Sequence, residues 1–458
     1  MNNMEKYAEF GIIASDPRFL KDDKNNDFLS KYDNGLLTID NWKLFTDTIK
    51  TIYDEVKINN EGNVASYIPQ LANVDPELFG ICVVSVDGQV FRIGDFDPSF
   101  CIQSCSKPIT YGLALKEHSE NIVHNFVGME PSGRNFNELC LNEDNLPHNP
   151  LINSGAIMTT SLIQSNKEQS NRFQYIYNFW NECVANTFLS FDNSVYLSEK
   201  DTADRNKCLG FMMQEKKAFK KGKSKKISKK INRKWNNDDL QKTLELYFQN
   251  CSIKTDLLGM GLLSAMLANG GVHPWTNKAL FSYKDVKKIL SIMLSCGMYD
   301  YSGEWCYKIG IPAKSGVSGL IYGVIPGVCG IAVYSPKLDK LGNSFRGIEF
   351  FKKFVKKINS HIFENRLNNY KLTIEHSLKM NDKINGYLLL DAAFNNDCDT
   401  VRNLLAKGIN VNYQDYDKRS ALHIASNENN KEAVELLIEN GANINLLDRW
   451  NNVAHKIE

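Results

Sequence analysis

Charge excess, long apolar runs and cysteine pairs are all missing from this sequence. Its 54 lysines and arginines balance 53 aspartates and glutamates over 458 residues, so the formal net charge is +1. Such a balance argues against a global attraction to nucleic acid or membranes. The two longest apolar stretches, Leu257–Ala268 and Gly319–Tyr334, are respectively too short and too rich in glycine to cross a bilayer. We therefore predict no nucleic-acid partner and no membrane partner.

The eleven cysteines are an odd number, without a CxxC pair or the Cys/His spacing of a metal site. The sequence also shows no secretory signal. Its first residues include Glu5 and Glu9 but no arginine before Arg18, which is unlike a mitochondrial transit peptide. These features predict reduced thiols, no bound metal and a cytoplasmic location.

The distribution of charged and apolar residues divides the chain into regions. Residues 1–62 are charged, and the helical periodicity of Trp42–Val56 predicts a small N-terminal helical region. Residues 63–363 begin and end with strand-like segments and contain many helix-like segments between them. That order predicts an α+β domain whose antiparallel sheet is built from both ends of the segment.

Local signals place the main elements of this domain. Asp87-Gly88 separates two strand-like runs and predicts a tight hairpin turn. Pro108 fits only a first helical turn, so a helix should begin at or just before Ser104. Further segments read as a buried helix, an amphipathic helix and paired strands: Thr255–Asn269, Lys284–Leu294 and Gly319–Val333.

A basic insertion, residues 216–237, interrupts the domain. Lys216–Lys234 hold eleven lysines and arginines and no acidic residue. Like-charge repulsion and few apolar residues predict a disordered surface loop. A role in binding nucleic acid or an acidic partner is the less favoured alternative, because no aromatic residues are interleaved with the charges.

The C-terminal part repeats itself. Residues 385–458 contain pairs of identical residues 33 positions apart, which is the ankyrin period, and residues 364–384 read as a linker. The pairs are Ala392/Ala425, Val401/Val434, Leu404/Leu437, Gly408/Gly441, Asn410/Asn443 and Asn412/Asn445. We predict all-α ankyrin repeats. Two repeats are too few to bury a core alone, so we expect this tail to contact another part of the protein or another subunit.

The first candidate catalytic residues are in the segment Ser104-Cys105-Ser106-Lys107. A serine one helical turn before a lysine places hydroxyl and amine on the same face. The lysine accepts the serine proton only if burial or nearby charge lowers its pKa. Lys314-Ser315-Gly316 follows about 200 residues later. In penicillin-binding proteins and class A β-lactamases the same two motifs occur in this order, so the pair suggests a β-lactamase-like fold.

A longer set of motifs resembles the serine-dependent glutaminases of animals and bacteria. The resemblance covers residues 63 to about 360, and the ankyrin tail is similar to that of the animal enzymes. The motifs occur in family order, as Tyr67–Ala72, Gln103–Pro108, Glu130–Gly133, Pro147–Ile157, Asp204–Asn206, Tyr247–Gln249, Leu267–Gly271, Cys296–Asp300 and Pro312–Gly319.

The resemblance implies hydrolysis of L-glutamine to L-glutamate and ammonia. Ser104 would form a γ-glutamyl ester, with Lys107 and Tyr299 as further catalytic residues and the N–H groups of Ser104 and Val317 as the oxyanion hole. The other substrate-binding positions match Tyr67, Asn153, Glu199, Asn206, Tyr247 and Tyr299.

The resemblance also implies a homotetramer or dimer, no organic cofactor, and activation by inorganic phosphate as an open question. Animal relatives are mitochondrial, which is the alternative to the cytoplasm. Gly128–Glu138 corresponds to a mobile loop that gates the site in those enzymes.

Purely structural roles remain alternatives for some of these residues. Tyr67 and Tyr247 could be packing aromatics, Asn153 a capping residue, and the role of Glu199 could fall to an acidic neighbour. Two other functions also stay open: β-lactam binding, by fold analogy alone, and a non-catalytic ankyrin scaffold with an inactive domain.

Overall fold

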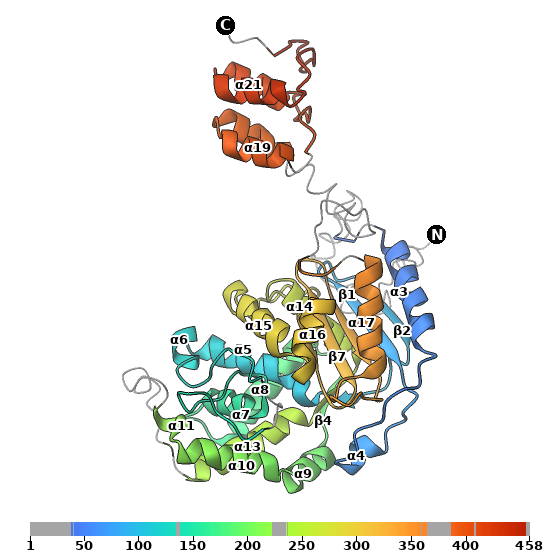
Figure 1. Cartoon of the computed structure of the whole chain (residues 1–458), viewed down its shortest axis with the longest axis vertical. Helices are drawn as coiled ribbons and strands as arrows, with labels where there is room; N and C mark the ends of the chain where they lie inside the picture. The colour runs from blue at the N-terminus through green and yellow to red at the C-terminus, as the bar shows by residue number, and fades with distance from the viewer. Residues whose placement is uncertain are drawn as a thin grey trace. The chain divides into compact units, whose positions relative to one another are not determined.

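In the computed structural model the chain forms two compact units, Met1–Glu364 and Asn365–Glu458, hereafter unit 1 and unit 2 (Figure 1). The structure describes residues 38–39, 41–133, 138–221, 235, 237–358, 360–363, 386–406 and 409–454.

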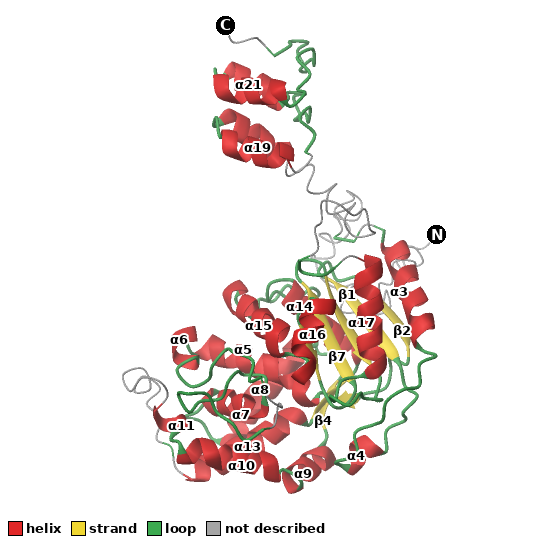
Figure 2. Cartoon of the chain, viewed as in Figure 1, coloured by secondary structure: helices red, strands yellow, loops and turns green. Residues whose placement is uncertain are grey.

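A five-stranded antiparallel sheet forms the centre of unit 1, in the order β2-β1-β8-β7-β6 (Figure 2). Its strands are β1 (Gly80–Ser85), β2 (Val90–Gly94), β6 (Ala313–Ser315), β7 (Leu320–Ile325) and β8 (Cys329–Tyr334). The predicted turn at Asp87-Gly88 joins β1 to β2. Because β1 pairs with β8, the two ends of residues 63–363 meet in one sheet, which confirms the predicted α+β fold.

Helices cover both faces of the sheet. Helix α14 (Leu257–Ala268) packs on one face, and α17 (Phe345–Ile358) with α3 (Trp42–Val56) packs on the other (Figure 1). The side chains of β1 alternate between the two layers, and all six of its residues are buried. A strand covered on both faces has no position for a polar residue facing water, which explains its continuous apolar run.

The remaining elements of unit 1 form a helical region beside this sheet. A small second sheet has the order β3-β5-β4, from Phe100–Cys101, Ile253–Thr255 and Leu189–Phe191. The helices are α4 (Pro69–Ala72), η1 (Gln103–Ser106), α5 (Lys107–Glu117), α6 (Glu120–Val123), α7 (Asn153–Leu162), α8 (Gln169–Cys183), α9 (Asn193–Asp201), α10 (Asp204–Glu215), α11 (Ala218–Lys221), α13 (Asn237–Cys251), α15 (Tyr283–Cys296), η3 (Tyr299–Tyr301) and α16 (Ser302–Lys308). Within the described ranges, every helix is too short or too polar to cross a bilayer.

Helix α3 spans the residues predicted for the N-terminal helical region and packs against α17 within unit 1. The predicted disorder of the basic insertion needs correction at its ends. The basic insertion is folded at both ends, because Phe219 of α11 stacks on buried Trp235 with ring centroids 4.2 Å apart. Residues 222–234, like residues 1–37, lie outside the described part of the chain.

Unit 2 contains α19 (Cys398–Ala406), α20 (Ala421–Asn427) and α21 (Lys431–Glu439) around its own apolar core. Helix α20 begins with a capping box, in which Ser420 and His423 satisfy each other's backbone groups. The repeat pairs predicted from the sequence contribute to this core, for example Ala425 and Leu437. The predicted linker, 364–384, lies outside the described residues.

Candidate active site

Ser104 lies at the junction between the small sheet and α5. Strand β3 ends at Cys101, and the 3₁₀ turn η1 leads directly into α5 with Pro108 in the first helical turn. Ser104 is partly exposed, whereas the residues on either side of it are buried. Because the first N–H groups of a helix lack intrahelical acceptors, the Ser104 N–H is available to a bound oxygen. The predicted helix start is confirmed, although its first turn is 3₁₀ and not α.

Lys107 is buried in the protein interior, with 1% of its surface exposed. Burial, and then the nearby charge of Lys314, lower the pKa of its amine to about 7. Its Nζ donates to Asn153 Oδ1 at 2.6 Å, and Asn153 Nδ2 in turn donates to Asn206 Oδ1 at 2.9 Å. Three predicted site residues from α5, α7 and α10 are therefore connected in one hydrogen-bonded chain.

Tyr299 contacts the side chain of Ser104. It opens η3 with a φ of +53°, which is a strained backbone conformation for a residue with a side chain. Burial raises the pKa of the phenol, while a hydrogen bond with the Ser104 side chain lowers it. Gln103, directly before Ser104, has a φ of +49°. Strained backbone is thus present directly before Ser104 and at its contacting residue Tyr299.

Glu199 of α9 is the acidic group of the site. Tyr67 donates its hydroxyl hydrogen to Glu199 Oε1 at 2.6 Å. Burial raises the pKa of Glu199, and the side chains of Tyr67 and Gln103 partly offset that rise by hydrogen bonding. Among the described residues, the groups that act on this buried carboxylate are uncharged, so it is suited to receive a cationic group of a ligand.

Tyr247 and Val317 complete the predicted set. Tyr247 of α13 is buried, and burial raises the pKa of its phenol, with Cys251 and Glu199 as neighbours. Val317 follows β6 and is partly exposed. The adjacent Gly316 lies so close to η1 that an added Cβ would be 3.0 Å from the Ile102 carbonyl oxygen. The segment carrying Val317 therefore borders the segment carrying Ser104.

Comparison with known proteins adds an independent observation. Residues 62–363 match the sequence profile of the glutaminase family, and residues 360–448 match ankyrin repeats. The chain is 38% identical over 419 residues to the rat protein named "Glutaminase liver isoform, mitochondrial", covering 91% of this chain and 67% of that protein. It is 38% identical over 418 residues to "Putative glutaminase 2" of Caenorhabditis elegans, covering 90% of this chain and 66% of that protein.

Bacterial relatives and solved structures agree. A glutaminase of Nostoc sp. is 39% identical over 317 residues, covering 69% of this chain and 89% of that protein. The solved structure of a probable glutaminase, ybaS, superimposes with a TM-score of 0.64 at 32% identity, covering 70% of this chain and 98% of the other. The chain belongs to the glutaminase family. The predicted resemblance is confirmed, and the chain spans about two thirds of the length of its animal relatives.

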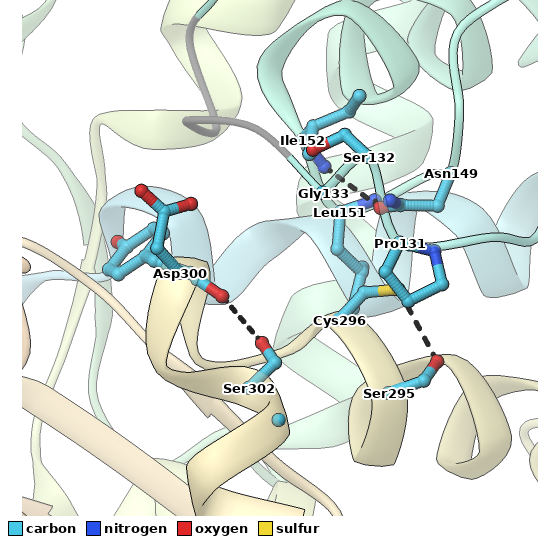
Figure 3. Close-up of a pocket in the computed structure, with 12 residues that line it drawn as sticks. Pro131, Ser132, Gly133, Asn149, Leu151, Ile152, Ser295, Cys296, Asp300 and Ser302 are labelled. Atoms are coloured by element: carbon cyan, nitrogen blue, oxygen red, sulfur yellow. Dashed lines mark hydrogen bonds between the residues drawn. The ribbon is translucent and has the colours of Figure 1, made fainter. Parts of the chain in front are cut away.

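One cavity of unit 1 adjoins Tyr299 (Figure 3). It has a volume of about 500 Å³. It is lined by Pro131–Gly133, by residues just before α7, by the end of α15, by η3 and by the start of α16. In the close-up, Asp300 and Ser302 lie on one side, and Ser132, Gly133 and Ile152 lie on the other. Ser104 is not among the lining residues, and the cavity reaches the surroundings of Ser104 at Tyr299.

The predicted gating loop, Gly128–Glu138, borders the cavity through Pro131–Gly133, while its residues 134–137 lie outside the described part of the chain. Sequence reasoning missed two neighbours of the candidate site residues. Gln103 lies beside Glu199, and Cys251 lies beside Tyr247, close enough to shift the pKa values of those two groups. Cys251 lies four residues after Tyr247, a spacing that brings two side chains together on one helix face; no sequence signal marks the side-chain contact of Gln103.

Proposed function

We propose that this chain hydrolyses L-glutamine to L-glutamate and ammonia through a γ-glutamyl ester on Ser104. Membership of the glutaminase family supports the reaction. The observation that carries the mechanism is Lys107, a buried amine one helical turn from a partly exposed serine, with a pKa of about 7. A lysine in that state is neutral in about half of the molecules at pH 7 and can accept a proton.

The covalent step uses the residues around Ser104. Ser104 Oγ attacks the side-chain carbonyl carbon of glutamine, and its proton passes to neutral Lys107, directly or through the Tyr299 hydroxyl. The N–H groups of Ser104 and Val317 donate to the oxygen that becomes negative. The proton then returns to the leaving nitrogen, which departs as ammonia. Water hydrolyses the ester with the same groups acting in reverse and releases glutamate.

Recognition of glutamine relies on charge and hydrogen bonding. Glu199, supported by Tyr67, would bind the α-ammonium group, since it is buried without a cation of its own among the described residues. Asn153 and Asn206 would donate hydrogen bonds to the α-carboxylate. Tyr247, on α13, would hydrogen-bond the substrate through its hydroxyl. A ligand with a carboxylate but no α-ammonium group would not require Glu199, so we infer that this residue determines selectivity for an α-amino acid.

The test is release of ammonia from L-glutamine by the purified chain beside Ser104→Ala, with and without inorganic phosphate. We expect release by the wild type and a fall of about 10⁴-fold or more in the variant, because the covalent route is lost. Equal rates in both proteins would contradict the nucleophile. Absence of release from the wild type in both buffers would favour the non-catalytic ankyrin scaffold, and acylation by a labelled penicillin would favour the β-lactam alternative.

Several properties stay predictions. The assembly is proposed to be a homotetramer or dimer without an organic cofactor, and phosphate activation is left to the assay above. The ankyrin tail is proposed to contact protein, as such repeats commonly do. The rat and mouse liver relatives carry the word mitochondrial in their names, which supports mitochondria as the alternative to the predicted cytoplasmic location.

A further inference from the structure

Lys314 is a second buried lysine beside the reacting groups. It lies on β6 and is fully buried, with no exposed surface. Its Nζ donates to the Ser315 carbonyl oxygen at 2.6 Å and lies 4.4 Å from the centroid of the Tyr299 ring. The sequence marks this residue through the Lys-Ser-Gly motif, and the proposed mechanism gives it no task.

An ordinary packing role does not explain a lysine at this place. Burial of an ammonium group costs several kcal/mol unless other groups compensate for it. Besides Tyr299 on η3, the titratable groups near Lys314 come from four elements: Lys107 on α5, Cys105 on η1, Cys251 on α13 and Cys296 on α15. Lys107 repels a cation, and the thiols are uncharged because burial raises each of their pKa values. The Tyr299 ring and the Ser315 carbonyl are therefore the groups that attract the ammonium.

Tyr299 needs such a restraint. Its backbone is strained, and its hydroxyl must stay directed at Ser104. A cation on the face of an aromatic ring restrains the position of the ring and leaves its edge free. It also stabilises negative charge that develops on the phenol oxygen during proton transfer. We propose that Lys314 is a positioning residue for Tyr299, an inference that rests on the glutaminase reaction proposed above.

A double-mutant cycle tests this role. Lys314→Met, Tyr299→Phe and the double variant are compared with the wild type by measuring kcat and KM for L-glutamine. We expect Lys314→Met to lower kcat about tenfold or more, because the cation–π contact and the aim of the hydroxyl are lost. KM should change less than about twofold. In the Tyr299→Phe background the same change should have little further effect, since the hydroxyl it positions is already absent. Lys308→Met, which removes an exposed lysine paired with Glu304, is the matched control.

The outcomes separate the two proposals. An unchanged kcat in Lys314→Met, or an equal loss in both Tyr299 backgrounds, overturns the positioning role while leaving the reaction intact. A wild type that releases no ammonia overturns both proposals. Lys314→Gln replaces Lys314→Met if the latter does not fold, as judged by its thermal midpoint. Should Tyr299→Phe be too slow to measure, crystal structures decide: a Tyr299 hydroxyl still directed at Ser104 in the slow Lys314 variant contradicts the role, and a displaced ring supports it.

Discussion

Burial of Lys107 lowers the pKa of its amine, and this predicts how activity depends on pH. Its pKa of about 7 predicts that kcat/KM rises about tenfold per pH unit below pH 7 and levels off above it, because only the neutral amine accepts the serine proton. Measurement from about pH 5.5 to 9 checks this. A flat profile between pH 6 and 8 would exclude Lys107 as the group that titrates.

The same burial predicts a gain in stability when the amine is removed. In the unfolded chain Lys107 has an ordinary pKa of 10.5, above its folded value of about 7. The unfolded state therefore binds more protons between pH 7 and 10.5, so this residue destabilises the fold most at and below pH 7 and progressively less as pH rises. Lys107→Met should raise Tm at pH 7 by a few degrees while abolishing activity. A lowered Tm at pH 7 would show that the bond to Asn153 outweighs the cost of burial.

We expect replacement of Glu199 to reduce activity only towards substrates that carry an α-ammonium group. Glu199→Gln should lower kcat/KM for L-glutamine about 100-fold or more, because the α-ammonium then faces no buried carboxylate. The matched control is 4-carbamoylbutanoate, which lacks the α-amino group and should be hydrolysed at similar low rates by wild type and variant. Equal losses with both substrates would mean that Glu199 supports the structure of the site and not the recognition of the ammonium.

At the scale of elements, α14 packs against the sheet through small residues. A Cβ added at Gly330 of β8 would lie 2.2 Å from the Ala265 backbone nitrogen, so the helix would have to move away. Gly330→Ala should therefore destabilise unit 1 by about 1–3 kcal/mol, seen as a lower Tm. Gly303→Ala is the control, since nothing lies within 4 Å of its added Cβ. Similar Tm values for both variants would contradict the close packing of α14 on β8.

Sequence patterning predicted most helices and strands because each of their faces meets either the apolar interior or water along its whole length. Strand β1 and the helix Leu257–Ala268 are almost entirely apolar, with one serine each, and every residue of both is buried. The helix start near Ser104 followed from Pro108. What patterning did not predict depends on distant contacts: the 3₁₀ turn at η1, the positive φ values of Gln103 and Tyr299, and the stacking of Phe219 on Trp235. Family motifs named the candidate site residues, but they do not give the partners of those residues.

For the whole molecule, the division into two units predicts what truncation does. Every candidate site residue and both cores around the sheet lie in unit 1, while unit 2 has a core of its own. A chain ending at Glu364 should therefore keep kcat and KM for L-glutamine within about twofold of the full chain. The comparison is made at several protein concentrations. A large loss of activity at all of them would show that the ankyrin tail contributes to the active conformation.

The sheet also constrains when this protein can fold during synthesis. Gly80 of β1 pairs with Tyr334 of β8, so the central strand pair cannot form until nearly three quarters of the chain has left the ribosome. Until then β1, which is buried at every position in the folded protein, has no strand on its β8 side. Helix α17 follows β8 in the chain and is also not yet available to cover the sheet. Closure of so long a loop is slow, and exposed apolar strands aggregate. We therefore expect nascent chains arrested before residue 313 to be protease-sensitive and bound by chaperones, and chains arrested well beyond residue 358 to resist digestion.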